Sequence, residues 1–232
     1  MNALSSFFGS TIGRKTIVAI TGLALFGFVV GHMIGNLQIF LGPEAINRYG
    51  AFLQGLGELL WAVRFGLLAM LVAHVFFTIK LRLENRAARP QTYAVTKRVA
   101  ATVPARWMAL SGLMVLCFII YHLLHFTVQE PRVNLTGANF IDLHDAEGRH
   151  DIYRMMIRGF QVPVVSFFYL LSVGLLAMHL QHGIQSLFQT LGLNSATLRP
   201  PLEKFSVVFS WLIFAGYAAI PAAVLAGFLK LP

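Results

Sequence analysis

Residues 21–32 have the sequence TGLALFGFVVGH, and residues 111–122 have the sequence SGLMVLCFIIYH. In each stretch a small hydroxyl residue precedes a glycine, nine mostly apolar residues follow, and a histidine ends the stretch. An imidazole inside hydrocarbon is costly unless it has a partner. The repeat therefore predicts that something binds these two histidines.

The composition is typical of an integral membrane protein. Of the 232 residues, 57% are hydrophobic and 12% are charged, and this charged share is about half that of a soluble domain. The single cysteine, Cys117, lies in an apolar run, which excludes a disulfide framework and a thiolate metal cluster. The basic residues flank apolar segments, so the net charge of +9 indicates membrane topology and not nucleic-acid binding.

Five segments reach the length of about 20 apolar residues that a membrane-spanning helix needs. They are residues 16–41, 59–81, 105–128, 160–187 and 205–229. We therefore expect an all-α integral membrane protein in which residues 1–232 form a single transmembrane domain. The first four helices should form a bundle, with the fifth packed outside it.

The charges between the expected spans predict their orientation. One side of the membrane receives eleven of the 18 Lys and Arg residues and two of the nine acids, and the other side receives seven of each. Because the positive side of a membrane protein faces the cytoplasm, we expect a cytoplasmic N-terminus and an outside C-terminus. The expected location is the inner, cytoplasmic membrane of a cell.

Four of the eight histidines fall at two matched depths. His32 and His122 lie in the outer halves of the first and third helices, and His74 and His179 lie in the inner halves of the second and fourth. At about 1.5 Å per residue, the two levels are roughly 14–15 Å apart.

This layout predicts two stacked b haems, each with two histidine ligands from facing helices. His32 and His122 would ligate the outer haem iron, and His74 and His179 the inner one. The glycines ten residues before the outer ligands would lie level with the inner haem. There the missing Cβ should let the edge of the macrocycle approach the backbone.

Other interpretations of the histidines are less well supported by the sequence. A single intramembrane histidine is often a polar contact between helices, but this does not account for two matched pairs. Other transition-metal sites commonly add carboxylate or thiolate ligands, and a proton relay would add intramembrane acids. A haem-free anchor or transporter is the alternative from a different class, and it predicts no visible spectrum.

Two further histidines make the ligand assignment ambiguous from periodicity alone. His125 follows His122 by three residues and His182 follows His179 by three, so each pair shares a helix face. Their depth in the membrane favours His122 and His179 as ligands. His125 and His182 are then candidates to support a ligand, a propionate or a quinone. The remaining histidines, His144 and His150, are expected to be solvated loop residues.

Three stretches resemble the cytochrome b membrane-anchor subunit of succinate dehydrogenases and fumarate reductases, in its single-chain, five-helix, two-haem form. They are GSTIGRKTIVAITGLALFGFVVGHMIGNLQIFLG (residues 9–42), YHLLHFTV (residues 121–128) and MHLQHGIQSLFQTLG (residues 178–192). In that family the first four helices supply the ligands. The family's ligand positions match His32, His74, His122 and His179.

The resemblance implies a role in respiratory electron transfer. The chain would carry electrons between an iron–sulfur subunit and membrane quinone, which by analogy with other two-haem members would be menaquinone. A flavoprotein subunit would interconvert succinate and fumarate, and both partner subunits would dock on the cytoplasmic side. Some relatives have a glutamate two residues before the fourth-helix ligand that moves compensating protons, whereas this chain has Ala177.

A haem b anchor of another respiratory enzyme is the nearest alternative, such as a nitrate reductase, a formate dehydrogenase or a hydrogenase. The nitrate reductase anchor concentrates its ligands on two helices. One histidine on each of four helices favours the succinate dehydrogenase family.

Further roles follow from the groups that haem propionates and quinones need. Cations and hydroxyls near the inner surface could bind propionates, although positive-inside anchoring explains the cations equally well. The propionate candidates are Arg14, Lys15, Thr21, Arg106 and Ser111. A quinone head group needs a hydrogen-bonding or proton-exchanging residue near the outer haem. The quinone-site candidates are Gln54, Glu58, Arg64 and His125.

Overall fold

The computed structural model describes residues 7–88 and 103–231, and the regular structure of these residues is helical apart from one isolated β-bridge. Five of the helices are long and apolar enough to cross a membrane, as in a multi-pass membrane protein. They are α2 (Thr11–Leu37, prolonged by the 3₁₀ turn η1, Gln38–Leu41), α4 (Glu58–Ala87), α5 (Val103–His122, prolonged by the π-helical turn η2, Leu123–Thr127), α7 (Pro163–Thr190) and α8 (Arg199–Leu225). The predictions of an all-α fold and of five spans are confirmed.

Two shorter helices were not predicted. They are α3 (Pro43–Gly55) and α6 (Ile152–Gln161), which pack against each other. Because α6 ends at Gln161, the fourth span begins at Pro163 and not at residue 160. A proline disfavours helical backbone in the residue before it, and Val162 is extended, with φ −79° and ψ 108°.

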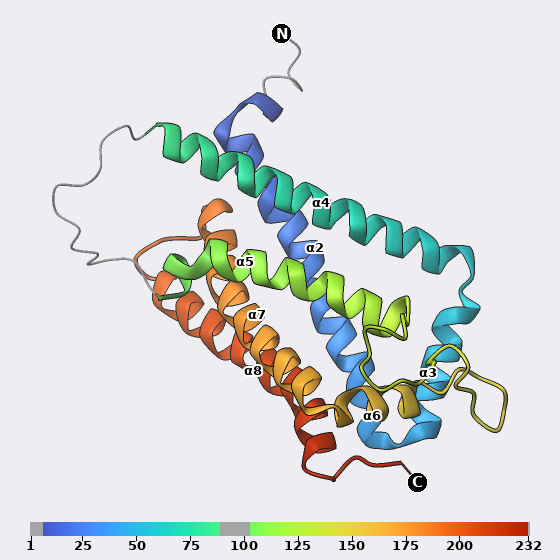
Figure 1. Cartoon of the computed structure of the whole chain (residues 1–232). Helices are drawn as coiled ribbons and strands as arrows, with labels where there is room; N and C mark the ends of the chain where they lie inside the picture. Colours follow the sequence, from blue (N-terminus) through green and yellow to red (C-terminus); the bar gives the residue numbers. More distant parts are fainter. Residues whose placement is uncertain (1–6, 89–102, 232) are drawn as a thin grey trace.

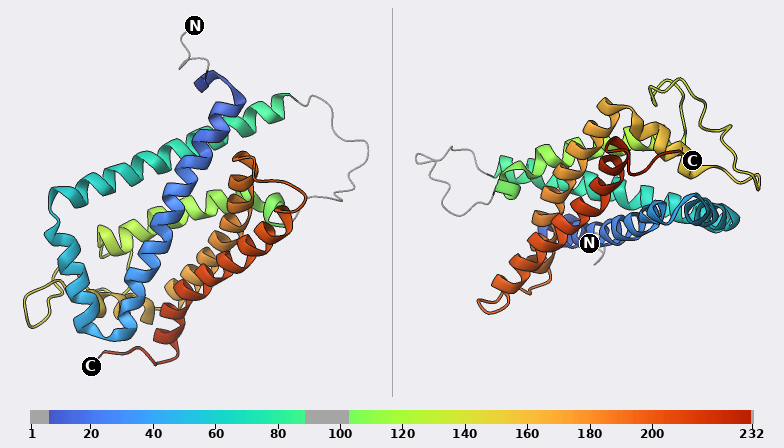
Figure 2. Two further views of the ribbon diagram at one scale, coloured as in Figure 1. Left: turned by 180° about the vertical axis from the view of Figure 1, so that it is seen from behind. Right: turned by 90° about the horizontal axis from the view of Figure 1, so that it is seen from below.

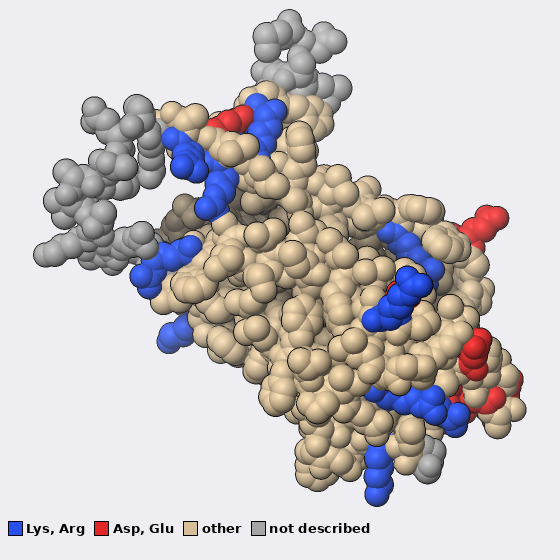
Figure 3. All heavy atoms as spheres, viewed as in Figure 1, with Lys and Arg blue, Asp and Glu red and all other residues tan. Residues whose placement is uncertain are grey.

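The molecule has two different ends. One, the loop end, carries α3, α6 and residues 128–151, whereas the other, the N-terminal end, carries the start of α2 and the end of α4 (Figure 1). In Figure 3, Lys and Arg side chains are visible at both ends, whereas most of the visible acidic side chains lie at the loop end.

The spans pack mainly as the pairs α2–α4, α5–α7 and α7–α8. In Figure 2 helix α2 lies between α4 and the α7–α8 pair, and α2 contacts both α7 and α8. An ion pair between Arg14 and Glu84 fastens α2 to α4 at the N-terminal end. The four helices that carry the predicted ligands are thus two pairs, joined through α2 and α7.

The buried apolar core lies at the loop end, where α3 and α6 meet the ends of α7 and α8. Its members come from η1, α3, α6, α7, α8 and the residues after α8. They are Ile39, Ile46, Tyr153, Met156, Ile157, Phe160, Val165, Tyr169, Ile220, Val224 and Leu229. By contrast, α4 has no buried residue. The loop end is therefore the well-packed half of the protein.

A polar network fastens α3 to the segment before α6. Arg149 donates hydrogen bonds to the carboxylates of Glu44, at 2.6 and 3.1 Å, and of Asp145, at 2.8 Å. Asn47 donates to the Asp151 carboxylate at 3.2 Å and accepts from the Tyr153 amide at 3.0 Å. The hydrogen bond to Arg149 lowers the pKa of Glu44 below its ordinary value of 4.5, and the same bond raises the pKa of Arg149.

Arg149→Gln should lower the melting temperature of the detergent-solubilised protein, because Glu44 and Asp145 lose their common cation. Since the pKa of Glu44 is lowered in the folded state, its contribution is complete above pH 4.5 and is lost as the pH falls through the lowered pKa. Thermal unfolding at pH 7 and at pH 3 should therefore show a smaller difference between variant and wild type at the lower pH.

Arg132→Gln is the matched control. The Arg132 side chain is 94% exposed and lies 3.9 Å from Glu130, and such exposed pairs contribute little. Equal melting temperatures for Arg149→Gln and the wild type at pH 7 would contradict the structural role of the network.

Candidate functional site

The predicted ligands are brought together as two pairs of imidazoles. The rings of His32 and His122 have centroids 5.7 Å apart and planes at 83°. Metal–imidazole bonds are about 2 Å long, so two rings on one metal ion have centroids roughly 6 Å apart. His74 and His179 occupy corresponding positions, each 16 residues after the start of its helix, and the ring of each is held by the preceding span.

The ring of His74 is held by α2 through one nitrogen. Its Nδ1 lies 3.2 Å from the carbonyl oxygen of Val18 and 3.2 Å from the hydroxyl of Thr21. A carbonyl oxygen can only accept, so Nδ1 carries the proton and Nε2 keeps its lone pair. A histidine with this tautomer can bind a metal through Nε2, and metal-binding histidines commonly donate their other N–H in this way.

The ring of His179 is held by α5 in the same manner. Its Nδ1 lies 3.5 Å from the hydroxyl of Ser111, and the ring also makes a hydrogen bond with the backbone of Met108. Met108 precedes Ser111 by three residues, just as Val18 precedes Thr21. The two repeated sequence stretches thus build one local arrangement twice, once between α2 and α4 and once between α5 and α7.

The two glycines of the repeat have a different neighbour from the one expected. A Cβ at Gly22 would lie 3.2 Å from Cε1 of His74, and a Cβ at Gly112 would lie 3.2 Å from Cε1 of His179. Both distances are tighter than ordinary van der Waals contact. Gly22 and Gly112 therefore make room for the imidazole of the neighbouring helix, whereas the sequence suggested the edge of a macrocycle.

The pair at the loop end is supported by side chains. The hydroxyl of Tyr169 lies 3.3 Å from Nδ1 of His122, and the ring of Phe28 stacks on His32 at 5.2 Å. Sequence reasoning missed Tyr169, although it precedes His179 by ten residues, the spacing that separates the two levels. That spacing places Tyr169 at the level of His122.

The arrangement fits haem ligation. A haem iron can take two axial ligands from the protein, and the separation of the His32 and His122 rings is compatible with this. Elsewhere in residues 7–88 and 103–231 no group of three or more His, Cys, Asp or Glu side chains converges as a metal site.

The propionate candidates occupy three different environments. Thr21 and Ser111 are buried against the imidazoles of His74 and His179. Arg14 pairs with Glu84 and donates to the backbone of residues 8 and 9. The other two candidates, Lys15 and Arg106, are exposed at the N-terminal end.

The quinone-site candidates are divided between two places. Gln54, Glu58 and Arg64 are exposed at the α3–α4 corner, where the guanidinium of Arg64 lies over the ring of Trp61. His125 is fully buried. No hydrogen bond or ion pair among the described residues joins His125 to the other three, so the structure does not bring the four together.

The remaining histidines lie outside the two pairs. His182 lines a cavity of about 250 Å³ at the N-terminal end, together with Gln185, Gln189 and Arg199. His150 was expected to be solvated, but it is half-buried, its Nε2 lies 3.0 Å from the Gln129 amide, and burial lowers its pKa. His144 lies beside it and is exposed.

Comparison of the chain with protein-family models, with curated proteins and with solved structures found no match.

Gly22→Leu should destabilise the protein by about 1–3 kcal/mol, because overpacking forces neighbouring groups apart and the nearest group is the ring of His74. Gly112→Leu should do the same through His179. Denaturant unfolding of the detergent-solubilised protein measures the loss. Gly27→Leu is the control, since a Cβ at Gly27 meets nothing within 4 Å. Equal losses at Gly22 and Gly27 would show that the imidazole contact is not responsible.

Proposed function

We propose that the chain is the dihaem cytochrome b membrane anchor of a succinate:quinone oxidoreductase. The observation that carries this proposal is the two-level pairing of imidazoles from four helices, with the His74 and His179 rings held through Nδ1. A polar contact between helices does not by itself explain why the same Nδ1 arrangement occurs at matched positions of two helix pairs.

Each imidazole pair would hold one b haem, which supplies one-electron redox chemistry. His32 and His122 would be the axial ligands at the loop end, and His74 and His179 those nearer the N-terminal end. The Val18 carbonyl and the Thr21 hydroxyl fix the proton of His74 on Nδ1. The protein's own contribution is thus to orient the rings, keep their Nε2 lone pairs available and exclude water from the bundle.

The orientation proposed for the chain places the basic N-terminal end in the cytoplasm of the cell and the loop end outside the inner membrane. A flavoprotein subunit and an iron–sulfur subunit would dock at the N-terminal end, so that electrons pass between the iron–sulfur subunit and the His74–His179 level. Succinate chemistry would belong to the flavoprotein subunit and not to this chain.

Quinone, menaquinone by analogy, would react near the His32–His122 level. The exposed Gln54, Glu58 and Arg64 at the α3–α4 corner are the candidates for its head group. Lys15 and Arg106 are the candidates that lie free to reach propionates at the N-terminal end. Position 177 of α7 is a buried alanine, which has no proton-exchanging group, so compensating protons would need a different path.

The test is a reduced-minus-oxidised spectrum of the purified chain with single-histidine variants and haem quantified per polypeptide. The wild type should carry two b haems. His32→Ala and His122→Ala should abolish the same spectral component, and His74→Ala and His179→Ala should abolish the other. Each pair should lose one component because both of its imidazoles would be needed to hold one haem.

His182→Ala is the matched control, since this residue lies on the same helix as His179 but lines the cavity at the N-terminal end. It should keep both components. A wild type that binds no haem would overturn the proposed function and favour a haem-free anchor. The pairing would be overturned if His32→Ala and His74→Ala abolished the same component while His32→Ala and His122→Ala abolished different ones.

A further inference from the structure

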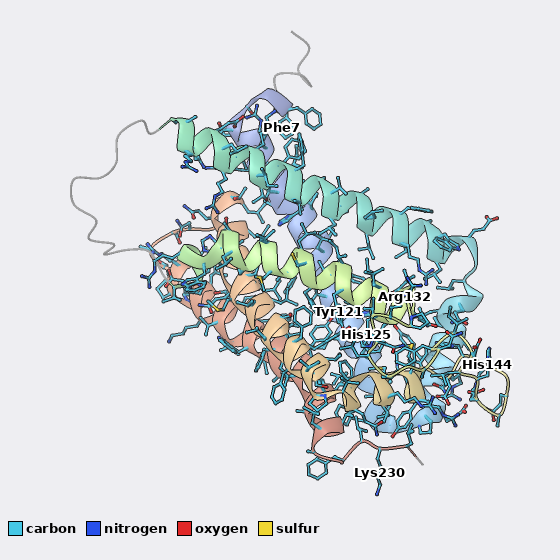
Figure 4. All side chains as sticks on the ribbon, in the orientation of Figure 1. Phe7, Tyr121, His125, Arg132, His144 and Lys230 are labelled. Carbon is cyan, nitrogen blue, oxygen red and sulfur yellow. The ribbon has the colours of Figure 1, made fainter. Side chains whose placement is uncertain are left out.

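His125 is a buried imidazole that the two haem pairs leave unused. Its ring is 0% exposed and stacks on Phe126, with centroids 3.9 Å apart and planes at 24°. Its Nδ1 lies 3.0 Å from the hydroxyl of Tyr169, whereas its Nε2 has no hydrogen-bond partner in the part of the chain that the structure describes. Figure 4 shows His125 beside Tyr121, where α5 reaches the loop end. A nitrogen buried in this way is costly, so its position needs a reason.

The Tyr169 hydroxyl joins His125 to a predicted ligand. It lies 3.3 Å from Nδ1 of His122 and 3.0 Å from Nδ1 of His125. A phenol has one proton, so it can donate to only one of these rings, and its oxygen can then accept from the other. The chain of three groups can therefore run in two directions, and each direction sets the tautomer of both histidines.

Only one direction is compatible with a ligand at His122. If Nε2 of His122 binds iron, its Nδ1 carries the proton and donates to the Tyr169 oxygen. Tyr169 then donates to Nδ1 of His125, and the proton of His125 is on Nε2, the nitrogen without a partner. In the opposite direction Tyr169 donates to His122, whose own proton then occupies Nε2 and blocks the metal.

We propose that His125 is a positioning residue that acts through Tyr169: it holds His122 in the tautomer that presents Nε2 to the outer haem iron and makes that ligand a stronger electron donor. This inference rests on the proposed function. At the inner level the carbonyl of Val18 fixes the tautomer of His74 without a second side chain. At the outer level the same task falls to a hydroxyl, whose direction must itself be set.

The local backbone is built around the His125 ring. The turn after His122 is π-helical, with Val128 N–H donating to the Leu123 carbonyl at 2.7 Å, and π-helical turns often occur at functional sites. A Cβ at Gly159 of α6 would lie 3.0 Å from Nε2 of His125. The close approach of α6 covers the ring, so it cannot leave Tyr169 for solvent without moving that helix.

The test is a potentiometric titration of the haems in the full chain purified from membranes, comparing wild type with Tyr169→Phe. Loss of the acceptor for the His122 N–H makes that ligand less basic, so ferric iron is stabilised less. The midpoint potential of the component lost in His122→Ala should rise, by about 59 mV for each tenfold change in ferric over ferrous preference. The other component should not move.

Tyr217→Phe is the matched control for loss of a buried phenol. The Tyr217 ring lies 6.3 Å from that of His32, but its hydroxyl donates to the Val29 carbonyl at 2.7 Å and contacts no imidazole nitrogen. This variant should leave both potentials unchanged. An equal shift in Tyr217→Phe and Tyr169→Phe would show that repacking, and not the hydrogen bond to His122, is responsible.

Two variants at His125 test its own role. His125→Asn keeps an acceptor near the position of Nδ1 and should preserve the outer potential, whereas His125→Leu removes the acceptor and should shift the potential upward or release the outer haem. If the wild type carries two haems but Tyr169→Phe and His125→Leu leave both potentials unchanged, this inference is overturned and the proposed function stands. If the wild type carries no haem, the proposed function itself is overturned.

Discussion

The structure depends on how an imidazole is accommodated between two membrane-spanning helices. Such a ring has two nitrogens, and each needs a partner in a medium without water. The helix backbone supplies the partner of one ring nitrogen. The Val18 carbonyl accepts from Nδ1 of His74, and the backbone of Met108 makes a hydrogen bond with the ring of His179. Gly22 and Gly112 allow this contact, because a side chain there would press on the ring. The pairs α2–α4 and α5–α7 owe their close approach to it.

The two levels of the bundle meet this requirement differently. Near the N-terminal end the partner of each ring is the backbone of a neighbouring helix. Near the loop end His122 depends on Tyr169, which belongs to the main apolar core with Phe160 and Val165. The polar network around Arg149 and Asn47 holds α3 and α6 over that core. The well-packed loop end thus surrounds the level at which the surroundings of His122 are side chains.

The sequence predicted the five spans and the two levels of histidines, because hydropathy and a fixed rise per residue are local properties. It did not predict α3 and α6, which are too short to stand out from hydropathy and gain their stability from packing at the loop end. The start of the fourth helix was misplaced because the apolar run continues through Val162, whereas the backbone breaks before Pro163.

The roles of the residues around the histidines were harder to predict, because sequence does not say which helix faces which. Thr21 and Ser111 were assigned to propionates from their depth, but α2 faces α4 and α5 faces α7, so their hydroxyls contact imidazoles. His125 was grouped with the exposed quinone candidates, although the covering α6 helix buries it. Tyr169 shares its depth with His122, and that spacing was the available signal, but the contact also depends on α5 facing α7.

The central claim is that each imidazole pair holds one metal between its rings. A cryo-EM map of the chain purified from membranes and reconstituted in lipid nanodiscs tests it most directly. The account predicts two planar densities, one between His32 and His122 and one between His74 and His179, each continuous with both rings. Rings that contact each other or neighbouring side chains, with no planar density between them, would contradict it.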